Sequence, residues 1–301
     1  MKLNLQGSLY VLGGAISYGI LATIVKYANH LGIHTSVLTF MQFSVGVLFL
    51  LIFNQIKNKQ LTSTPPPVQR KSILKLLAFG SSLGLTSSLY YLSIQYIPVS
   101  LGIILLMQSI WMSMILEALV NKQRITAIKV IATLTVIFGT LLATNILFEH
   151  AAINWLGIFI GLGAGLSYTI SMYASSTIEN QLPSYTRSKY LVMGGLIAIV
   201  LFWNVDIIQN FNTVTILYWG TMLAVFGTIV PPLLFTKGIP LIGIGYGAII
   251  AAIEIPVSIL SAHLILKEQI GLMQGFGVLI IIGAVVAVNS RSGRTKEEDI
   301  C

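Results

Sequence analysis

The chain has 301 residues, of which 55% are hydrophobic and 9% are charged, and its mean hydropathy is +0.88. Soluble domains carry about a quarter charged residues, so this composition excludes an ordinary soluble protein and indicates that most of the surface faces lipid. The net charge of +8 would suit nucleic acid, but the basic residues are scattered between apolar runs, which argues against that partner.

Apolar stretches long enough to cross a bilayer, about 20 residues each, follow one another along the whole chain. The polar, proline-rich segment 54–72 separates the second stretch from the third, and short connections at Pro98 and Pro240 are predicted to turn at the proline. The ten predicted spans are 7–27, 36–54, 73–96, 98–120, 125–147, 153–175, 189–208, 214–237, 240–266 and 270–289.

The lysine and arginine residues predict how these spans are oriented. If the N-terminus is cytoplasmic, all of the 17 lysine and arginine residues except Lys26 and Lys267 fall on the cytoplasmic side. We therefore expect a multi-pass protein of the cytoplasmic (plasma) membrane, with its N- and C-termini inside.

The two halves of the chain are similar in sequence. The stretch "GSLYVLGGAISYGI" from Gly7 matches "GIFIGLGAGLSYTI" from Gly157, and "IFGTLLATN" (137–145) matches "IIGAVVAVN" (281–289) in the same order. Each half contains five spans, and because five is odd the second half enters the membrane from the opposite side. Inverted repeats of this kind are typical of alternating-access transporters.

These patterns together predict the fold class. We expect an all-α membrane protein with ten transmembrane helices, arranged as two inverted-topology five-helix repeats, with both termini cytoplasmic. The first repeat covers 7–147 and the second covers 153–289, and a charged cytoplasmic tail follows at 290–301.

Glu254 is an acidic residue in the ninth span, "AAIEIPVSILSAH" (251–263). It lies about 20 Å along the helix from Pro240, near the bilayer midplane, where a charge costs roughly 2.5–3.5 kcal/mol. Its face of the helix is small and polar and includes Ser258, and Pro256 should leave one backbone carbonyl without its amide partner. Glu254 is therefore either a cavity-lining acid that binds solute or a proton, or a permanently protonated structural residue.

In the fourth span, Gln108 occupies the position that the repeat relates to Glu254. Trp111 follows it one helical turn later. An amide opposite an acid at the midplane is where an inverted-repeat carrier places its substrate, so we expect both residues to line the same cavity as Glu254. The alternatives are an interhelical hydrogen bond for Gln108 and simple packing for Trp111.

Three tyrosines are further candidates for the cavity lining. Tyr18 and Tyr168 occupy equivalent positions at mid-depth in the two repeats, and Tyr91 follows Tyr90 in the third span. Each offers an aromatic face and a hydroxyl group, although core packing explains them equally well.

Two charged residues near helix ends are weaker candidates. Lys26 and Glu117 each lie about one turn from the end of a predicted span, and we expect both to snorkel into the interface.

The segment "IEIPVSILSAHLILKEQI" (253–270), together with the tyrosine-bearing first span that ends near Lys26, resembles the bacterial EamA-type transporters of the drug/metabolite transporter (DMT) superfamily. The resemblance covers residues 7–289. It implies a transporter of a small organic solute, such as an amino acid, a metabolite or an amphipathic toxic compound. Many members have an arginine in the second helix where this chain has Gln42, so the role of that arginine in anion recognition does not carry over.

The remaining sequence features narrow the function. Cys301 is the single cysteine, and no HExxH motif, phosphate-binding glycine loop or cluster of histidines and carboxylates occurs, so the sequence predicts no cofactor and no metal site. We expect a secondary transporter, not an enzyme, whose partners are a small-molecule substrate and the lipid bilayer, with proton coupling as a hypothesis and no indication of oligomeric state. The alternatives are a membrane-embedded lipid-modifying enzyme and a non-transporting receptor.

Overall fold

The computed structural model describes residues 2–60, 68–97, 99–122, 125–144, 154–210, 213–267 and 269–291, and within these ranges it contains helices and no strand. The predicted turn at Pro98 and most of the predicted tail at 290–301 lie outside the described residues. The helices are α1 (Lys2–His30), α2 (Thr35–Lys59), α3 (Arg70–Ser93), α4 (Val99–Met107), α5 (Ser109–Asn121), α6 (Ala127–Ala143), α7 (Trp155–Thr177), α8 (Ser184–Asn210), α9 (Thr213–Ala224), the π-helix η2 (Val225–Ile229), α10 (Val230–Ile242), α11 (Ile244–Ala251), α12 (Glu254–Leu266) and α13 (Leu272–Arg291).

Nine helical segments in the described part of the chain are long and apolar enough to span a membrane, and α6 is a shorter apolar helix. They correspond in order to the ten predicted spans, which are confirmed as apolar helices. Helices satisfy their own backbone hydrogen bonds, as a span surrounded by lipid requires. Two spans are broken between α-helices, one shared by α4 and α5 and another by α11 and α12, and a third, shared by α9 and α10, contains the π-helix η2.

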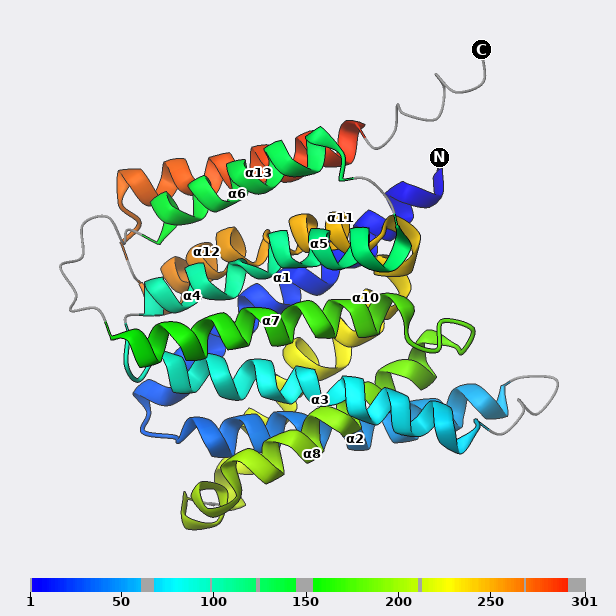
Figure 1. Ribbon diagram of the computed structural model, residues 1–301. Coiled ribbons are helices and arrows are strands. Elements are labelled where there is room, and N and C mark those ends of the chain that lie inside the picture. Colours follow the sequence, from blue (N-terminus) through cyan, green and yellow to red (C-terminus); the bar gives the residue numbers. More distant parts are fainter. Residues whose placement is uncertain are drawn as a thin grey trace.

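The two repeats pack against each other through several pairs of helices, one from each repeat (Figure 1). Helix α6 packs on its repeat mate α13 at one edge of the bundle, and α2 packs on its mate α8 near the other edge. Likewise, α1 packs on α10 in the way that α7 packs on α3. These pairings are the ones that a twofold relation between inverted repeats produces. The start of α1 and the end of α13 lie at the same end of the bundle.

The turn expected at Pro240 lies three residues later. Helix α10 continues through Pro240 to Ile242, and the chain turns at Gly243, whose φ of 88° favours glycine. Pro240 has no amide hydrogen to donate to the carbonyl of Thr236, but a side-chain nitrogen of Arg187 donates to that oxygen at 3.1 Å. Because this carbonyl has a replacement donor, the proline does not end the helix.

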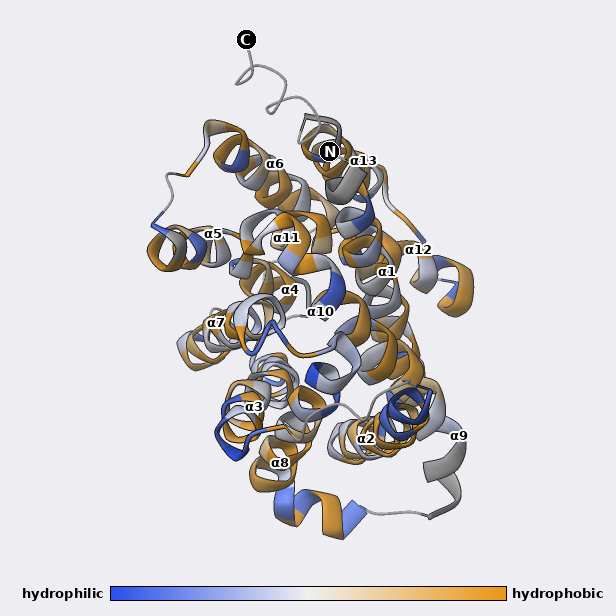
Figure 2. Cartoon of the chain, turned by 90° about the vertical axis from the view of Figure 1, so that its right-hand side faces the viewer, coloured by the Kyte–Doolittle hydropathy of each residue, from blue (hydrophilic) through white to orange (hydrophobic). Residues whose placement is uncertain are grey.

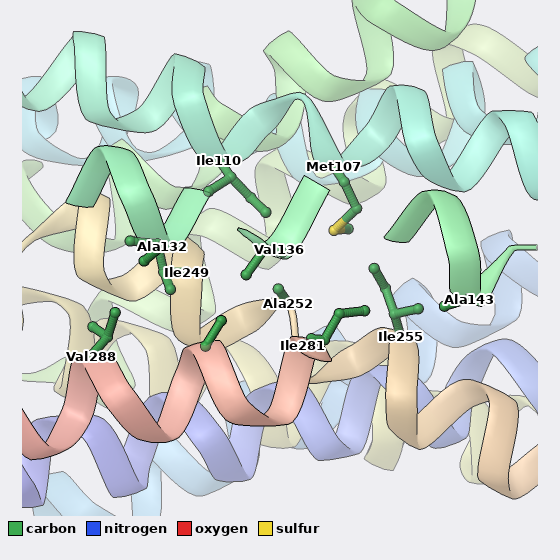
Figure 3. Packing of buried hydrophobic residues seen from close by; sticks show 11 residues of the cluster. Met107, Ile110, Ala132, Val136, Ala143, Ile249, Ala252, Ile255, Ile281 and Val288 are labelled. Carbon is green, nitrogen blue, oxygen red and sulfur yellow. The ribbon is translucent and has the colours of Figure 1, made fainter. Parts of the chain in front are cut away.

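The hydrophobic core lies where the repeats meet (Figure 3). Met107 and Ile110 of the interrupted α4–α5 span pack with Val136 of α6, Ile249 of α11 and Ile281 of α13. Large apolar residues are also exposed on the outside of the bundle, and the outer helices in Figure 2 are coloured as hydrophobic along much of their length. In a membrane these outer side chains contact lipid, so their exposure is not a cost.

Close helix contacts depend on glycine. Gly84 of α3 lies directly against the backbone carbonyl of Gly195 on α8, so a side chain at Gly84 has no room, and a side chain at Gly195 would collide with the ring of Phe43 on α2. Small residues at such crossings let helices approach within backbone contact, which is how helices associate in lipid.

Candidate substrate-binding site

A cavity of about 360 Å³ lies between the two repeats. Its walls come from α1, α3, α4 and α6 of the first repeat and from α7, α12 and α13 of the second. A space of this size holds a small organic molecule. The position between repeats is where an inverted-repeat protein can expose a bound molecule to either side in turn.

Glu254 enters the cavity from a break in its helix. The amides of Ala252 and Ile253 each bond to a carbonyl three residues earlier, so α11 ends and α12 begins with Glu254 in its first turn. The carbonyl of Ala252, expected to lack a partner because of Pro256, accepts from the amide of Ile255 at 3.1 Å. The carboxyl group therefore lies at the N-terminal end of a helix, where the helix dipole favours negative charge.

Tyrosine side chains share the cavity with this carboxyl group. The hydroxyl of Tyr168 lies 3.5 Å from Oε2 of Glu254, at the long limit of a hydrogen bond. Tyr18 and Tyr90 line the same cavity, and the Tyr90 ring lies 5.7 Å from that of Tyr91. The carboxyl group thus shares the cavity with aromatic rings and phenolic hydroxyls, which can hold an organic group through both apolar and polar contacts.

Helix α1 comes into backbone contact with α12 beside Glu254. A Cβ atom placed on Gly19 would lie 2.7 Å from the backbone oxygen of Glu254 and 2.7 Å from Cβ of Val257. Glycine at this position is therefore what lets α1 of the first repeat reach the site on α12 of the second.

Five of the seven residues that we predicted as a site line this one cavity: Tyr18, Tyr91, Tyr168, Glu254 and Ser258. They come from four helices and from both repeats, so the tertiary structure brings together what the sequence holds far apart.

Gln108 and Trp111 do not line this cavity, contrary to our expectation. The backbone amide of Gln108 donates to the carbonyl of Leu105 and not to that of Ile104, which a regular helix would require. The side-chain amide of Gln108 donates to the carbonyl of Ile104 instead, at 3.0 Å. Trp111 donates to the side-chain oxygen of Gln108 at 2.8 Å and is 37% exposed on the outside of the bundle. Gln108 thus closes the gap between α4 and α5 in place of a backbone bond.

Several lining residues were not among the predicted site residues. Thr86 on α3, Met107 on α4 and Gln274 on α13 gave no signal, because they are ordinary residues within apolar spans. Lys26 also lines the cavity. Its spacing of seven residues from Gly19, nearly two helical turns, places it on the same face of α1.

The cavity continues toward one end of the molecule. A second space of about 430 Å³ shares Lys26, Tyr91 and Ser258 with the first and reaches Asn29 and His30, at the end of α1. Asn29 and His30 are exposed. The site therefore has an approach from the end of the bundle where α1 finishes.

The model of the EamA-like transporter family matches the chain twice, over residues 5–145 and 155–290. The chain belongs to the EamA-like transporter family. The resemblance in the sequence is thereby confirmed, and the protein is a multi-pass membrane protein of a family that transports small solutes. The two matched stretches correspond to the two repeats.

The other comparisons add the fold. No curated protein matches this EamA-like transporter. Among solved structures 28 chains match, and one of them, described only as "Crystal structure of protein", has a TM-score of 0.75 with 12% identity. That similarity covers 94% of this chain and 98% of the other. At such low identity it shows the shared fold alone.

The end of this EamA-like transporter opposite the approach is held by buried polar groups. Arg187 of α8 is 1% exposed and donates to the carbonyls of Ala174, Ser175 and Ile178 at the end of α7, as well as to Thr236 of α10. A guanidinium group suits this position because its several donors lie in fixed directions. Arg187 thereby ties three helices of the second repeat together.

Glu117 joins the two repeats at the same end of this transporter. Its side chain is buried, with 8% exposed, so the expectation that it snorkels to the interface was wrong. The carboxylate pairs with Lys129 of α6 at 2.5 Å and accepts from the amide of Gly245 in α11 at 3.2 Å. The ammonium group of Lys129 also lies 4.4 Å from the ring centre of Tyr246. These contacts draw the carboxylate inward.

Proposed function

We propose that this EamA-like transporter carries a small organic solute across the cytoplasmic membrane as a secondary transporter that works by alternating access. The observation that supports this most directly is the cavity between the repeats, with a carboxyl group, Glu254, placed in it by a helix break. The repeats 7–147 and 153–289 are the two units that move relative to each other, and the solute lies between them.

The site consists of the predicted residues that share the cavity. Glu254 binds a polar or charged group of the solute, Tyr18 and Tyr168 contact its apolar part, and Tyr91 and Ser258 line the approach. Gln108 and Trp111, which we predicted beside them, are outside this proposal because their contacts are with each other and with α4.

Alternating access is supported by the difference between the two ends of the bundle. The cavity approaches the exposed end of α1, whereas buried contacts of Arg187 and Glu117 hold the opposite end. An inverted repeat can adopt two arrangements in which the open and closed ends exchange, because each half can take the role of the other. The arrangement here is then the one open at the end of α1. With both termini cytoplasmic, as the lysine and arginine distribution predicts, this is the outside.

Proton coupling follows from the surroundings of Glu254. An ionised carboxylate among aromatic and aliphatic groups needs a compensating positive charge, either from a proton or from the solute. If solute and proton compete for the same carboxyl group, the carboxyl group carries one of them at a time. The solute then crosses the membrane in one direction and the proton in the other. Exchange of solute for a proton is therefore the coupling that we propose.

The test begins with ligand discovery on purified protein. A thermal-shift screen with amino acids, amines and metabolite mixtures identifies compounds that stabilise the fold, since a ligand that binds the folded state raises the melting temperature. Each stabilising compound is then assayed for counterflow in proteoliposomes that contain a pH-sensitive dye. We expect counterflow, with a pH change inside that accompanies net solute entry.

The control variants separate transport from other functions. Glu254→Gln should abolish the pH change, whereas Glu179→Gln, which removes a carboxylate from the α7–α8 connection outside the cavity, should leave transport unchanged. Ligand binding without counterflow would contradict a transporter and favour a receptor. Counterflow with an undiminished pH change in Glu254→Gln would refute proton coupling through this residue.

A further inference from the structure

We propose that Glu117, Lys129 and the amide of Gly245 form a latch, which closes the inner end of the bundle and must open in each transport cycle. The inner end is the one opposite the approach to the cavity. We also propose that the lack of a charged latch at the outer end makes the arrangement seen here the resting one. Because a latch matters only if the two repeats move, this inference rests on the proposed function.

The inner end is shaped to receive a carboxylate. A Cβ atom on Gly245 would lie 2.6 Å from Oε2 of Glu117, and one on Gly243 would collide with Oε1, so glycine at both positions leaves the space that the carboxylate fills. Oε2 contacts the ammonium group of Lys129 at 2.5 Å and accepts from the amide of Gly245 at 3.2 Å. The latch therefore holds α11 of the second repeat to α5 and α6 of the first.

The ends of the helices identify the position that the repeat relates to Glu117. Helices α5 and α12 both end at a lysine in the left-handed conformation, Lys122 with a φ of 51° and Lys267 with a φ of 59°. Glu117 lies five residues before Lys122, as Ala262 lies five residues before Lys267. The outer counterpart of the carboxylate is therefore an alanine.

The starts of the next helices identify the position that the repeat relates to Lys129. Helices α6 and α13 are repeat mates, and Lys129 and Gln274 each lie two positions after the first residue of their helix. The side-chain oxygen of Gln274 accepts from the amide of Gly271 at 3.0 Å. Ala262 and Gln274 both line the space that continues the cavity toward the end of α1. The counterparts of the two charged latch residues thus lie in the open approach, and both are uncharged.

A second pair of repeat-related residues differs in exposure in the same sense. Ala22 of α1 and Met172 of α7 are related by the shift that aligns Gly7 with Gly157. Ala22 is exposed and lines both the cavity and its continuation, whereas Met172 is 1% exposed and belongs to the hydrophobic core. If the open and closed ends exchange, Met172 takes the surroundings that Ala22 has here. The two positions therefore report which end is open.

The charges make the two arrangements unequal in free energy. An interaction that is present in only one of two arrangements favours that arrangement by its own free energy. The side chains of Glu117 and Lys129 are 8% and 13% exposed, and a charge left in apolar surroundings without its partner is costly. Alanine and glutamine at the outer end cannot form an ion pair. Removal of the inner carboxylate should therefore shift the balance toward the arrangement that is open at the inner end.

Cysteine labelling measures this balance. In a background that carries Cys301→Ser, which removes the single cysteine, Ala22→Cys and Met172→Cys are made separately and treated with a hydrophilic maleimide in detergent. We expect Ala22→Cys to react fast and Met172→Cys to react slowly. Addition of Glu117→Gln should speed the reaction of Met172→Cys about tenfold and slow that of Ala22→Cys by about half, because one arrangement gains what the other loses.

Matched variants separate the latch from a general loss of stability. Glu179→Gln removes a carboxylate that lies 3.6 Å from Lys75, whose side chain is 64% exposed, and it should change neither rate, since exposed pairs contribute little. Ala262→Glu combined with Gln274→Lys places the charges of the latch at the outer end. This double variant should shift labelling in the same direction as Glu117→Gln, by more than its two single variants together. Melting temperature and elution on size exclusion establish that each variant is folded.

The outcomes separate the latch from the function itself. Faster labelling of Met172→Cys with no slowing of Ala22→Cys would indicate only a loosened fold and would overturn the latch, as would unchanged rates in Glu117→Gln. A double variant at Ala262 and Gln274 that behaves as the sum of its single variants would overturn the explanation of the resting arrangement. The transport proposal is tested separately by counterflow of the unmodified protein, so these results reject the latch alone when counterflow occurs.

Discussion

The carboxylate of Glu117 accepts a hydrogen bond from the amide of Gly245 at 3.2 Å, and this contact joins α5 of the first repeat to the first turn of α11 in the second. Amides in the first turn of a helix have no partner within that helix, so a carboxylate there satisfies an unpaired donor and meets the positive end of the helix dipole. Helix α11 leads directly to the break before Glu254. The contact and the cavity carboxyl group therefore lie on the same interrupted span, α11–α12.

Replacement of Glu117 should lower stability through Lys129. In Glu117→Gln the ammonium group of Lys129, whose side chain is 13% exposed, loses its carboxylate and keeps only the ring of Tyr246, and a buried charge without an opposite charge is costly. We expect a loss of about 2 kcal/mol, measured as a lower melting temperature in detergent. The double variant Glu117→Gln with Lys129→Met should recover part of this loss, because it removes the unpaired charge. A double variant less stable than Glu117→Gln alone would show that the ion pair is not the reason.

A methyl group at Gly19 should separate α1 from α12. Its Cβ would lie 2.7 Å from the backbone oxygen of Glu254, a contact that the fold must relieve by moving a helix. Gly19→Ala should cost about 1–3 kcal/mol in stability and weaken solute binding at Glu254. The matched control is Gly283→Ala on α13, where nothing lies within 4 Å of the added atom. Equal binding by the two variants would mean that this helix contact does not shape the site.

Gln108 should affect stability and leave solute affinity unchanged. Its side chain bonds to the carbonyl of Ile104 at the gap between α4 and α5, so Gln108→Ala exposes an unsatisfied carbonyl in an apolar setting. We expect a lower melting temperature, by about 1–2 kcal/mol of stability, with the dissociation constant of the solute within twofold of wild type. The solute affinity of Gln108→Ala is compared with that of Ser87→Ala, which changes a polar residue that does line the cavity. A large loss of affinity in Gln108→Ala would restore Gln108 to the site.

Arg187 should not tolerate replacement by lysine. Lysine keeps the charge, but its single ammonium group cannot reach the carbonyls of Ala174, Ser175 and Thr236 together. Arg187→Lys should lose about 2–4 kcal/mol of stability, since buried carbonyls lose their donors, and proteolysis between α7 and α8 should become faster. Lys189→Arg, two residues away on α8, is the conservative exchange that should change neither measurement.

Much of the lining of the cavity could be predicted from the sequence because the membrane limits the alternatives. A carboxyl group at mid-depth in the membrane, such as that of Glu254, must face protein or water and not lipid. The small and polar residues on its side of the helix indicated that this side meets protein. Tyr18 and Tyr168 were found because the repeat relates them. For Lys26 the sequence predicted only a position near a helix end. It gave no information on the contact at Gly19, which turns this face of α1 toward the cavity.

Gln108 shows why the prediction failed where it did. Its depth and its repeat relation to the Glu254 region are as expected, but a side-chain amide can bond within its own helix when the helix is interrupted. The break between α4 and α5 that creates this need is a property of the packed protein, and no proline or glycine in the sequence marks it.

The sequence by itself determined the membrane class, the number and order of the apolar helices, and the inverted repeat, since each follows from the length and spacing of apolar runs that lipid requires. Only the tertiary structure decided which polar groups meet. The rotation of each helix about its axis, and the breaks in α4–α5 and α11–α12, arise from packing between residues far apart in the chain. They place Glu254 in the cavity between the repeats, direct Glu117 inward to Gly245, and turn Gln108 back onto its own helix.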